Sequence, residues 1–296
     1  MNSMCGVCGA TTARELYTAR DRLGNSDKEF TIVECERCGV WRTLPEMTES
    51  ELAVFYPDEY WGGAGEPDLA WIRSSQSDKI RFLNGCELSG GRILDIGCGS
   101  GFFLRALEES KWERFGVEIG KSASEQAARA LGHDHILSGT VFEAGFADAF
   151  FDVVSLWSAL EHTNEPRANL IEARRIVKPG GTLIVQVPNT ASYQARWFGG
   201  EWFALDAPRH RYHFSTQTLE RLLSETGFAT YRRSFFSKAH NSHALRQSLK
   251  TRLRQSGSSL AHTMLFYLSI PLIKPLDLAM TAFDEGATLT VAARAA

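Results

Sequence analysis

The chain has 296 residues, of which 44% are hydrophobic and 23% charged, and its net charge is −3. This composition is ordinary for a globular protein with a large core, and the slight negative charge excludes a surface that coats nucleic acid throughout. No charged region followed by an apolar stretch, typical of a secretory signal, stands at the N-terminus, so we expect a cytoplasmic protein.

Four cysteines near the N-terminus form two matched pairs. Cys5 and Cys8 belong to one Cys-x-x-Cys-Gly sequence, and Cys35 and Cys38 belong to the other. Two such turns can supply four thiolates to one tetrahedral zinc ion, and thiolate ligands also fit a reducing compartment. Redox dithiols and unpaired structural cysteines are the alternatives. We predict a structural zinc ribbon over residues 1–45, followed by a linker with short helices over residues 46–80.

A glycine-rich turn follows an apolar strand that ends at Asp95. Gly97, Gly99 and Gly101 stand at alternate positions, and a helical pattern begins at Phe102. Such a turn brings backbone N–H groups close to a ligand. The dinucleotide fingerprint needs glycine or alanine where Phe102 stands, so the turn predicts a different nucleoside cofactor. An ordinary glycine-rich turn is the alternative.

The next segments alternate between strands and helices. Residues 115–118 are predicted as a strand ending in Glu118, whose carboxylate can accept both hydroxyls of a ribose. Residues 150–157 form an apolar run typical of a buried parallel strand, and Glu161-His162 follows it. A helix is predicted over 164–177, ending at a Lys-Pro-Gly-Gly sequence, and another strand over 182–187.

This order of segments resembles the class I S-adenosylmethionine (SAM) methyltransferases over roughly residues 80–235. The Gly-x-Gly-x-Gly turn resembles the first motif of that family, and the FDVV, EHT, VKPGG and VPN sequences match its later segments. The resemblance implies an α/β fold with a Rossmann-like seven-stranded methyltransferase sheet and helices on both faces. It also implies that the last strand lies antiparallel between the fifth and sixth.

The same resemblance assigns the cofactor site. Asp95 would lie near the methionine amino end of SAM, and the glycines would admit its ribose. The family often has an acidic residue near Gly139 for adenine; Thr140 stands there, so Thr140, Val141 or Phe142 would take that role. Tyr60 and Trp61 would form a lid over SAM, or would instead pack on the ribbon. The predicted cofactor-binding residues are Asp95, Gly97, Cys98, Gly99, Gly101, Glu118, Ile119, Thr140, Trp157 and Tyr60.

The loop over residues 205–215 carries the candidate general base. Methyl transfer from a sulfonium is an in-line displacement, which a base assists when the acceptor is a hydroxyl or an acidic carbon. We favour His210 as that base, with a loop-shaping hydrogen bond as the alternative. His162 is the second candidate, or else it steadies the cofactor pocket. Arg209 and Arg211 could orient an anionic substrate or be solvated. The aromatic residues near the loop could wall a pocket or pack in the core; they are Trp197, Phe198, Trp202 and Phe203.

The C-terminal part is basic and contains no Asp or Glu from Thr226 to Leu276. Leucines and cations form adjacent stripes of a predicted helix from about residue 242, and an apolar run follows that is too short to span a bilayer and is interrupted by Pro271 and Pro275. A helical insertion packed on the core, a phosphate-bearing substrate, and peripheral membrane contact through residues 242–273 are the alternatives. The predicted domains are a SAM-binding core over 81–236, the insertion over 237–285 and a closing strand over 286–296.

We therefore predict a SAM-dependent methyltransferase that modifies a hydroxyl of a sugar, nucleotide-sugar or related small molecule, with C- or N-methylation left open. An RNA methyltransferase that docks through the ribbon is disfavoured, because residues 1–45 are not strongly basic and Val187-Pro188-Asn189 lacks the Asn/Asp-Pro-Pro-aromatic motif. DNA is not expected as a partner. A non-catalytic binding protein that kept the fold is the remaining alternative.

Overall fold

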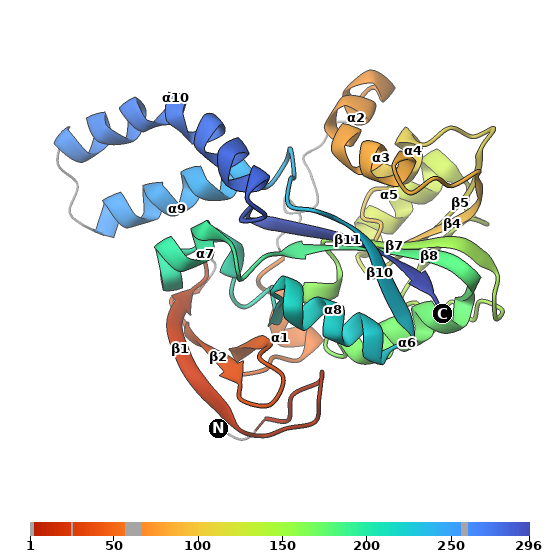
Figure 1. Cartoon of the computed structure of the whole chain (residues 1–296), viewed down its shortest axis with the longest axis horizontal. Coiled ribbons are helices and arrows are strands. Elements are labelled where there is room, and N and C mark those ends of the chain that lie inside the picture. Colours follow the sequence, from red (N-terminus) through yellow and green to blue (C-terminus); the bar gives the residue numbers. More distant parts are fainter. Residues whose placement is uncertain (1–2, 25, 57–66, 256–259) are drawn as a thin grey trace. The chain divides into compact units, whose positions relative to one another are not determined.

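The computed structural model describes residues 3–24, 26–56, 67–255 and 260–296 (Figure 1). The chain divides into two compact units. The first combines Met1–Phe55, Val187–Leu219 and Ser234–Leu289, and the second combines Tyr56–Gln186, Glu220–Arg233 and Thr290–Ala296.

The second unit is built on a seven-stranded sheet with the order β10-β11-β8-β7-β4-β5-β6. β4 pairs in parallel with β5 and β7, and the neighbouring pairs β5–β6 and β7–β8 are also parallel. The strands are β4 (Gly91–Ile96), β5 (Trp112–Glu118), β6 (Ile136–Ser138), β7 (Phe151–Trp157), β8 (Val177–Pro188), β10 (Phe228–Ser234) and β11 (Thr288–Ala295). This sheet confirms the predicted α/β methyltransferase fold. The last strand, β11, lies between β8 and β10, which are the fifth and sixth strands of the sheet in chain order, as predicted.

The order of the strands fixes where a ligand can bind. From β4 the chain proceeds outward to β5 and β6, and then returns to the other side of β4 for β7 and β8. The carboxyl ends of β4 and β7 therefore flank a topological switch point, the usual ligand-binding crevice of open α/β sheets. Asp95 on β4 and Ser155 on β7 face each other in register next to this point.

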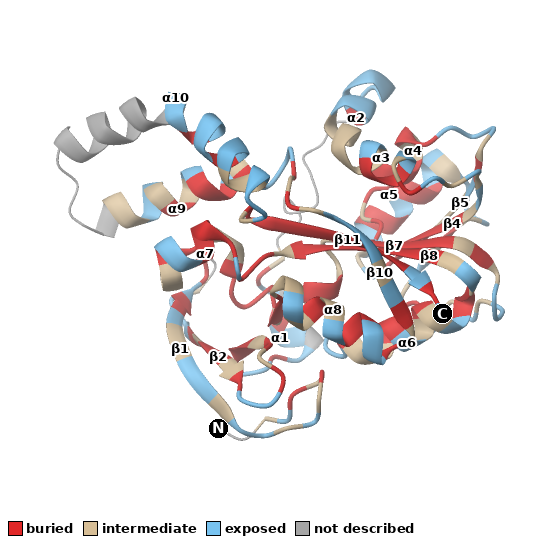
Figure 2. Cartoon of the chain, viewed as in Figure 1, coloured by how far each residue is buried: buried red, intermediate tan, exposed pale blue. Residues whose placement is uncertain are grey.

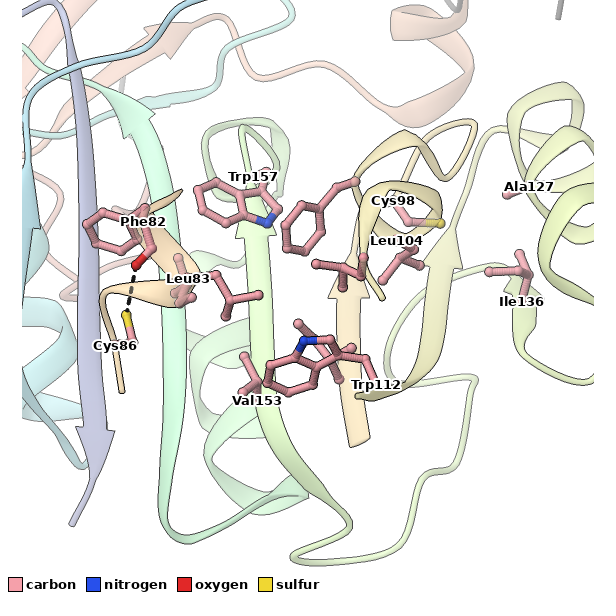
Figure 3. Packing of buried hydrophobic residues seen from close by; sticks show 14 of the residues in the cluster. Phe82, Leu83, Cys86, Cys98, Leu104, Trp112, Ala127, Ile136, Val153 and Trp157 are labelled. Atoms are coloured by element: carbon pink, nitrogen blue, oxygen red, sulfur yellow. Dashed lines mark hydrogen bonds between the residues drawn. The ribbon is translucent and has the colours of Figure 1, made fainter. Parts of the chain in front are cut away.

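One face of the sheet is covered by an apolar core (Figure 3). Phe82 and Leu83 come from α3, Leu104 comes from α4, and Val153 and Trp157 come from β7. Burial of such side chains stabilises the fold by about 25 cal/mol for each Å² of apolar surface removed from water. Figure 2 shows that the central strands are buried along most of their length. The helices of this unit are α2 (Leu69–Ser75), α3 (Ser77–Asn84), α4 (Phe102–Ala106), α5 (Lys121–Leu131) and α6 (Pro166–Ile176), and α8 (Thr216–Glu225) extends into it.

The first unit contains a four-stranded antiparallel sheet with the order β1-β2-β3-β9. Its strands are β1 (Ala13–Arg20), β2 (Glu29–Cys35), β3 (Trp41–Leu44) and β9 (Tyr212–His213). The N-terminal ribbon thus takes up a strand from a segment about 170 residues later in the chain, because Trp41 pairs with His213 and Arg42 with Tyr212. No local pattern in the sequence predicts this pairing.

The helices of the first unit are α1 (Glu49–Ala53), α7 (Tyr193–Phe198), α9 (Asn241–Gln255) and α10 (Leu260–Ala282). α10 continues through Pro271 and Pro275, so these prolines interrupt the apolar run without ending the helix. Both prolines are exposed, so the Pro271 carbonyl group, which has no N–H partner at Pro275, can be hydrated. Within the described residues, no helix combines the length and apolar character that crossing a membrane requires.

Candidate active site

The glycine-rich turn after β4 has a backbone that only glycine adopts readily. The φ angles of Gly97, Gly99 and Gly101 are 73°, 54° and 76°. A Cβ on Gly97 would lie 2.8 Å from the Cβ of Ala159, and one on Gly101 would lie 3.1 Å from the Cβ of Ala127. A Cβ on Gly99 would meet no described atom within 4 Å. Gly97 and Gly101 therefore permit close packing, whereas Gly99 faces space in which a ligand can approach the backbone.

Glu118 ends β5 beside this turn and is buried. Its Oε2 accepts a hydrogen bond from the Gly99 N–H at 2.9 Å, and its Oε1 accepts one from the Gly120 N–H at 2.7 Å. Burial raises the pKa of Glu118, and these backbone N–H groups oppose the rise. Because each carboxylate oxygen has a second lone pair, Glu118 can hold the turn and still accept the two hydroxyls of a ribose.

Asp95 lies 2% exposed near the end of β4. The Ser155 hydroxyl donates a 2.7 Å hydrogen bond to its Oδ1. Burial raises the pKa of Asp95 to about 7, although Lys79 and Ser155 act in the opposite direction. Burial also lowers the pKa of Lys79, whose Nζ lies 5.4 Å from the ring centroid of Trp157. A buried carboxyl group with a pKa this high is typical of functional sites that change charge when a ligand binds.

Two predicted cofactor residues direct their side chains into the core. Trp157 lies 5.1 Å from Phe103 and 6.4 Å from Phe82 between ring centroids. Its Nε1 has no hydrogen-bond acceptor among the residues that the structure describes. Cys98 is also in the apolar cluster, where its Sγ would lie 2.7 Å from a Cβ on Gly116 (Figure 3). Cys98 can therefore offer its backbone to a cofactor, while its sulfur fills the core.

The remaining predicted cofactor residues differ in exposure. Ile119, just after β5, is 58% exposed. The Thr140 hydroxyl donates to Glu143 Oε2 at 2.8 Å and also accepts from the Glu143 N–H at 3.3 Å, so it forms the first turn after β6. Tyr60 and the other proposed lid residue, Trp61, lie outside the described residues.

The second-choice base, His162, lies in the short 3-10 helix η2 (Leu160–His162) after β7. Its Nδ1 lies 3.0 Å from the hydroxyl of Tyr56. Glu161 beside it is 1% exposed. His162 belongs to the second unit, as do Asp95 and Glu118.

His210 lies in the first unit, on the loop before β9. Its Nδ1 lies 2.9 Å from the carbonyl oxygen of Ala204, which can only accept, so Nδ1 carries the hydrogen. In the neutral ring the lone pair is therefore on Nε2, and Asp206 Oδ2 lies 3.8 Å from that atom. The fixed tautomer thus makes Nε2 the nitrogen that can accept a proton, and the negative charge of Asp206 would stabilise the imidazolium.

The neighbouring His213 is held differently. The Thr43 hydroxyl donates to the carbonyl of His210 at 2.6 Å, and it lies 3.0 Å from His213 Nε2. Since that hydroxyl hydrogen is used, His213 Nε2 donates to Thr43. His213 is 1% exposed and pairs with Trp41, so its role is to attach the loop to the ribbon.

Arg209 fits neither of its two predicted roles. It is fully buried, and its guanidinium bonds Asp206 and Asp21 Oδ1, the latter at 2.8 Å, as well as the carbonyl of Phe55. Arg22 adds a second cation 2.7 Å from Asp206. Buried charges persist only when paired in this way, so the cluster joins the end of β1 to the His210 loop.

Three of the four aromatic residues near the loop take the second of their predicted roles, which was packing. Phe198 and Trp202 are buried, whereas Trp197 is 58% exposed. The ring of Phe203 lies under the Arg22 guanidinium, 3.7 Å from its central carbon. These contacts make Phe198, Trp202 and Phe203 part of the packing that supports the loop.

The four ribbon cysteines converge in the first unit. Their Sγ atoms all lie within 4.8 Å of one another, with 3.8 Å between Cys5 and Cys38 and 3.5 Å between Cys8 and Cys35. Tetrahedral zinc with Zn–S bonds of about 2.3 Å separates its sulfurs by about 3.8 Å, so the cluster fits a ZnS₄ site. The two turns are alike: the N–H that follows each pair donates to the carbonyl of the pair's first cysteine, at 2.7 and 2.8 Å.

Sequence reasoning missed Lys79, Ser155 and Tyr56. Ser155 had a signal, since it is a polar residue inside an apolar strand, and the parallel register places it opposite Asp95. Lys79 and Tyr56 had none, because their positions depend on how the segment before the core packs.

A family model described as a methyltransferase domain matches residues 70–232, more than half of the chain. The chain belongs to the class I SAM-dependent methyltransferases. This is a family of enzymes, so the second unit carries an enzyme domain. The predicted family is confirmed, and the matched region includes β4 to β10 and the His210 loop but not the cysteine pairs.

Curated relatives are similar to this methyltransferase over about half of its length. The ubiquinone biosynthesis O-methyltransferase of Maricaulis maris is 30% identical over 156 residues, which are 49% of this chain and 61% of that protein. The protein of the same name from Methylococcus capsulatus is 26% identical over 166 residues, or 53% and 69%.

Solved structures are similar in fold. A SAM-dependent methyltransferase from Archaeoglobus fulgidus has a TM-score of 0.51 at 19% identity, covering 80% of this chain and 97% of that one. Phosphoethanolamine N-methyltransferase 2 of Haemonchus contortus, solved with SAM, has a TM-score of 0.52 at 15% identity, covering 86% and 62%. At these identities the likeness concerns the fold alone.

Proposed function

We propose that this methyltransferase transfers the methyl group of SAM to a hydroxyl of a small-molecule acceptor. The observation that supports SAM as the cofactor is the pair of buried carboxyl groups, Asp95 on β4 and Glu118 at the end of β5, with Glu118 bonded to the Gly99 N–H of the glycine-rich turn. A dedicated pair of desolvated acids is costly to the fold, and a ligand with an ammonium group and a ribose would compensate both.

These residues would divide the cofactor between them. Glu118 would accept the ribose hydroxyls, and the backbone of Gly99 would lie against the cofactor. Asp95 Oδ2 would face the amino group of SAM, while the Ser155 hydroxyl holds Asp95 Oδ1. The bound cofactor supplies an electrophilic methyl group on a sulfonium. The protein's own contribution is then mainly orientation and the exclusion of water.

His210 would remove the acceptor proton at Nε2. Its Nδ1–H bond to Ala204 selects that nitrogen, and Asp206 would stabilise the imidazolium that forms. A positioned base of this kind contributes roughly 100- to 10,000-fold to rate. His162, oriented by Tyr56, is the alternative base.

The acceptor that we prefer is a hydroxyl of a sugar or nucleotide-sugar. An acceptor of ubiquinone biosynthesis is the second candidate, because the names of the curated relatives give that function, and these O-methyltransferase names also favour oxygen as the methylated atom. The ribbon would bind one structural zinc ion through Cys5, Cys8, Cys35 and Cys38 and would leave no open coordination position.

One experiment separates the acceptor classes. The protein is incubated with methyl-labelled SAM and a cell extract, which is then fractionated into polar metabolites, lipids and RNA. We expect label in a polar metabolite that acid or alkali does not release as methanol, as befits an ether rather than an ester. Label in lipid would favour the quinone candidate, label in RNA would revive docking by the ribbon, and no label above a Glu118→Gln variant would overturn the proposal.

A further inference from the structure

The outward face of α10 is apolar in its described half. Leu272, Leu276 and Ala279 follow at helical spacing, and Phe283 just beyond the helix continues the same stripe. Leu272 is 67% exposed and Phe283 is 73% exposed. Surface helices of globular proteins normally turn such residues inward, so an exposed apolar stripe indicates an interaction surface.

The inward face of the same helix carries its carboxylate. Asp277 is 1% exposed, and its oxygens accept from Ser242 at 3.0 Å, Gln194 at 3.4 Å and Tyr193 at 3.5 Å. These donors come from α7 and α9 of the same unit. The polar contacts fix the rotation of α10, so that the leucines cannot turn inward without breaking the Asp277 network.

The neighbouring helix α9 carries exposed positive charge. α9 and α10 pack against each other, as Figure 1 shows. Ala244, Leu245 and Ser248 face inward on α9, whereas Arg246 and Lys250 are exposed. Neither of these cations forms an ion pair within the described residues, and no Asp or Glu occurs between Thr226 and Leu276. Figure 2 shows the exposed faces of both helices.

We propose that the α9–α10 pair docks on an anionic lipid bilayer. The stripe of α10 enters the boundary between headgroups and acyl chains, and Arg246 and Lys250 face the lipid phosphates. Charge favours this occupant over a second copy of this chain, because the exposed cations Arg246 and Lys250 complement lipid phosphates and would repel their equivalents in a second copy. This inference is independent of the acceptor, and its test reads binding rather than methyl transfer.

The test is flotation of the full chain with phosphatidylcholine vesicles that contain or lack about one third phosphatidylglycerol. We expect binding to the anionic vesicles that weakens with added salt. Arg246→Glu/Lys250→Glu should weaken it by more than about 25-fold, because each lost surface cation contributes about fivefold and the two new carboxylates add repulsion from the lipid phosphates. Leu272→Ser/Phe283→Ser should abolish it at any salt concentration tested.

Matched controls are Arg129→Glu, an exposed cation of α5, and Ile171→Ser, a 55% exposed residue of α6. Both should bind as the wild type does. Absence of vesicle binding, or binding that the α9 and α10 variants leave unchanged, would overturn the proposal. So would light scattering that shows a dimer which Leu272→Ser/Phe283→Ser dissociates in a protein that does not bind vesicles.

Discussion

The Ser155 hydroxyl donates a 2.7 Å hydrogen bond to Oδ1 of Asp95 across the β4–β7 register. The bond orients the carboxyl group and uses only Oδ1, so Oδ2 can accept from another partner. Burial is nevertheless the strongest influence on Asp95 and raises its pKa to about 7. The group is therefore poised to lose its proton when a cation binds beside it.

We expect the affinity for SAM to depend on the protonation of Asp95. If the carboxylate must be ionised to hold the SAM ammonium group, a pKa of about 7 makes the Kd about eightfold larger at pH 6.0 than at pH 7.5. Both values lie below the usual pKa of a free α-amino group, about 7.7–8.0, so most of the ligand stays protonated at both. Titration calorimetry at the two pH values measures the ratio. In Asp95→Asn the ratio should disappear and binding should be weak throughout; an unchanged ratio would assign the titration to another group.

The same group makes stability without ligand depend on pH. Its folded pKa is raised above the unfolded value of 3.8, so its contribution is fully present below about pH 4 and is lost as the pH rises through about 7. We therefore expect Asp95→Asn to stabilise the ligand-free protein at pH 8 by a few kcal/mol relative to its effect at pH 4.5. Chemical denaturation at both pH values checks this, with Asp134→Asn as an exposed control. Equal effects at the two pH values would contradict it.

Glu118→Gln should weaken SAM binding by about 100-fold or more. The amide keeps one good acceptor, whereas the carboxylate bonds two backbone N–H groups and would add two ribose hydroxyls, and hydrogen bonds to a charged group are worth about 1.5–3 kcal/mol each. Glu125→Gln on the exposed side of α5 is the control. Near-normal calorimetric affinity in Glu118→Gln would remove the ribose assignment.

His210→Asn should lower the rate of label transfer by roughly 100- to 10,000-fold while leaving the Kd for SAM unchanged. His213→Asn, which removes the contact to Thr43, should instead lower the melting temperature and change the rate less. Rates over a range of pH separate base catalysis from loop distortion, because only loss of the base removes the limb that rises with pH. A full rate in His210→Asn with a collapsed rate in a His162→Asn variant would transfer the role to His162.

Metal analysis of the purified protein should find about one zinc per chain. Cys35→Ser should lose that zinc and lower the melting temperature, whereas Cys86→Ser, a buried cysteine apart from the cluster, should keep it. Trypsin cleavage near Arg211 should accelerate in Cys35→Ser, because β9 pairs with β3 of the ribbon. Zinc-free wild type with unchanged melting would show that the thiols form another kind of site.

Local patterns in the sequence predicted the central sheet well. Each inner strand is an apolar run, and Asp95, Glu118 and the glycines mark where strands end, so the order of elements and the buried carboxyl groups at the strand ends could be found without a structure. Ser215 caps α8, with its Oγ accepting from the Thr218 N–H at 3.2 Å. These features depend on residues that are close in the chain.

Long-range pairings could not be predicted in this way. Arg209 looks like a surface cation in a loop rich in basic residues, and its burial depends on Asp21, 188 residues away. The exposure of Leu272 likewise depends on Asp277 meeting donors from two other helices. In both cases the deciding partner lies in another element, and no local periodicity reveals it.

The pairing of Trp41 with His213 affects how the N-terminal segment can vary among relatives and how it can be exchanged by engineering. The matched methyltransferase region begins at residue 70, so a chain shortened to that region would retain the His210 loop but lose the strand, the Thr43 hydroxyl and the Asp21 carboxylate that hold it. Exchange of the N-terminal segment between relatives would fail for the same reason, unless residues 205–215 were exchanged with it. The ribbon and the loop are thus expected to vary together, as one transferable piece made of two distant stretches of chain.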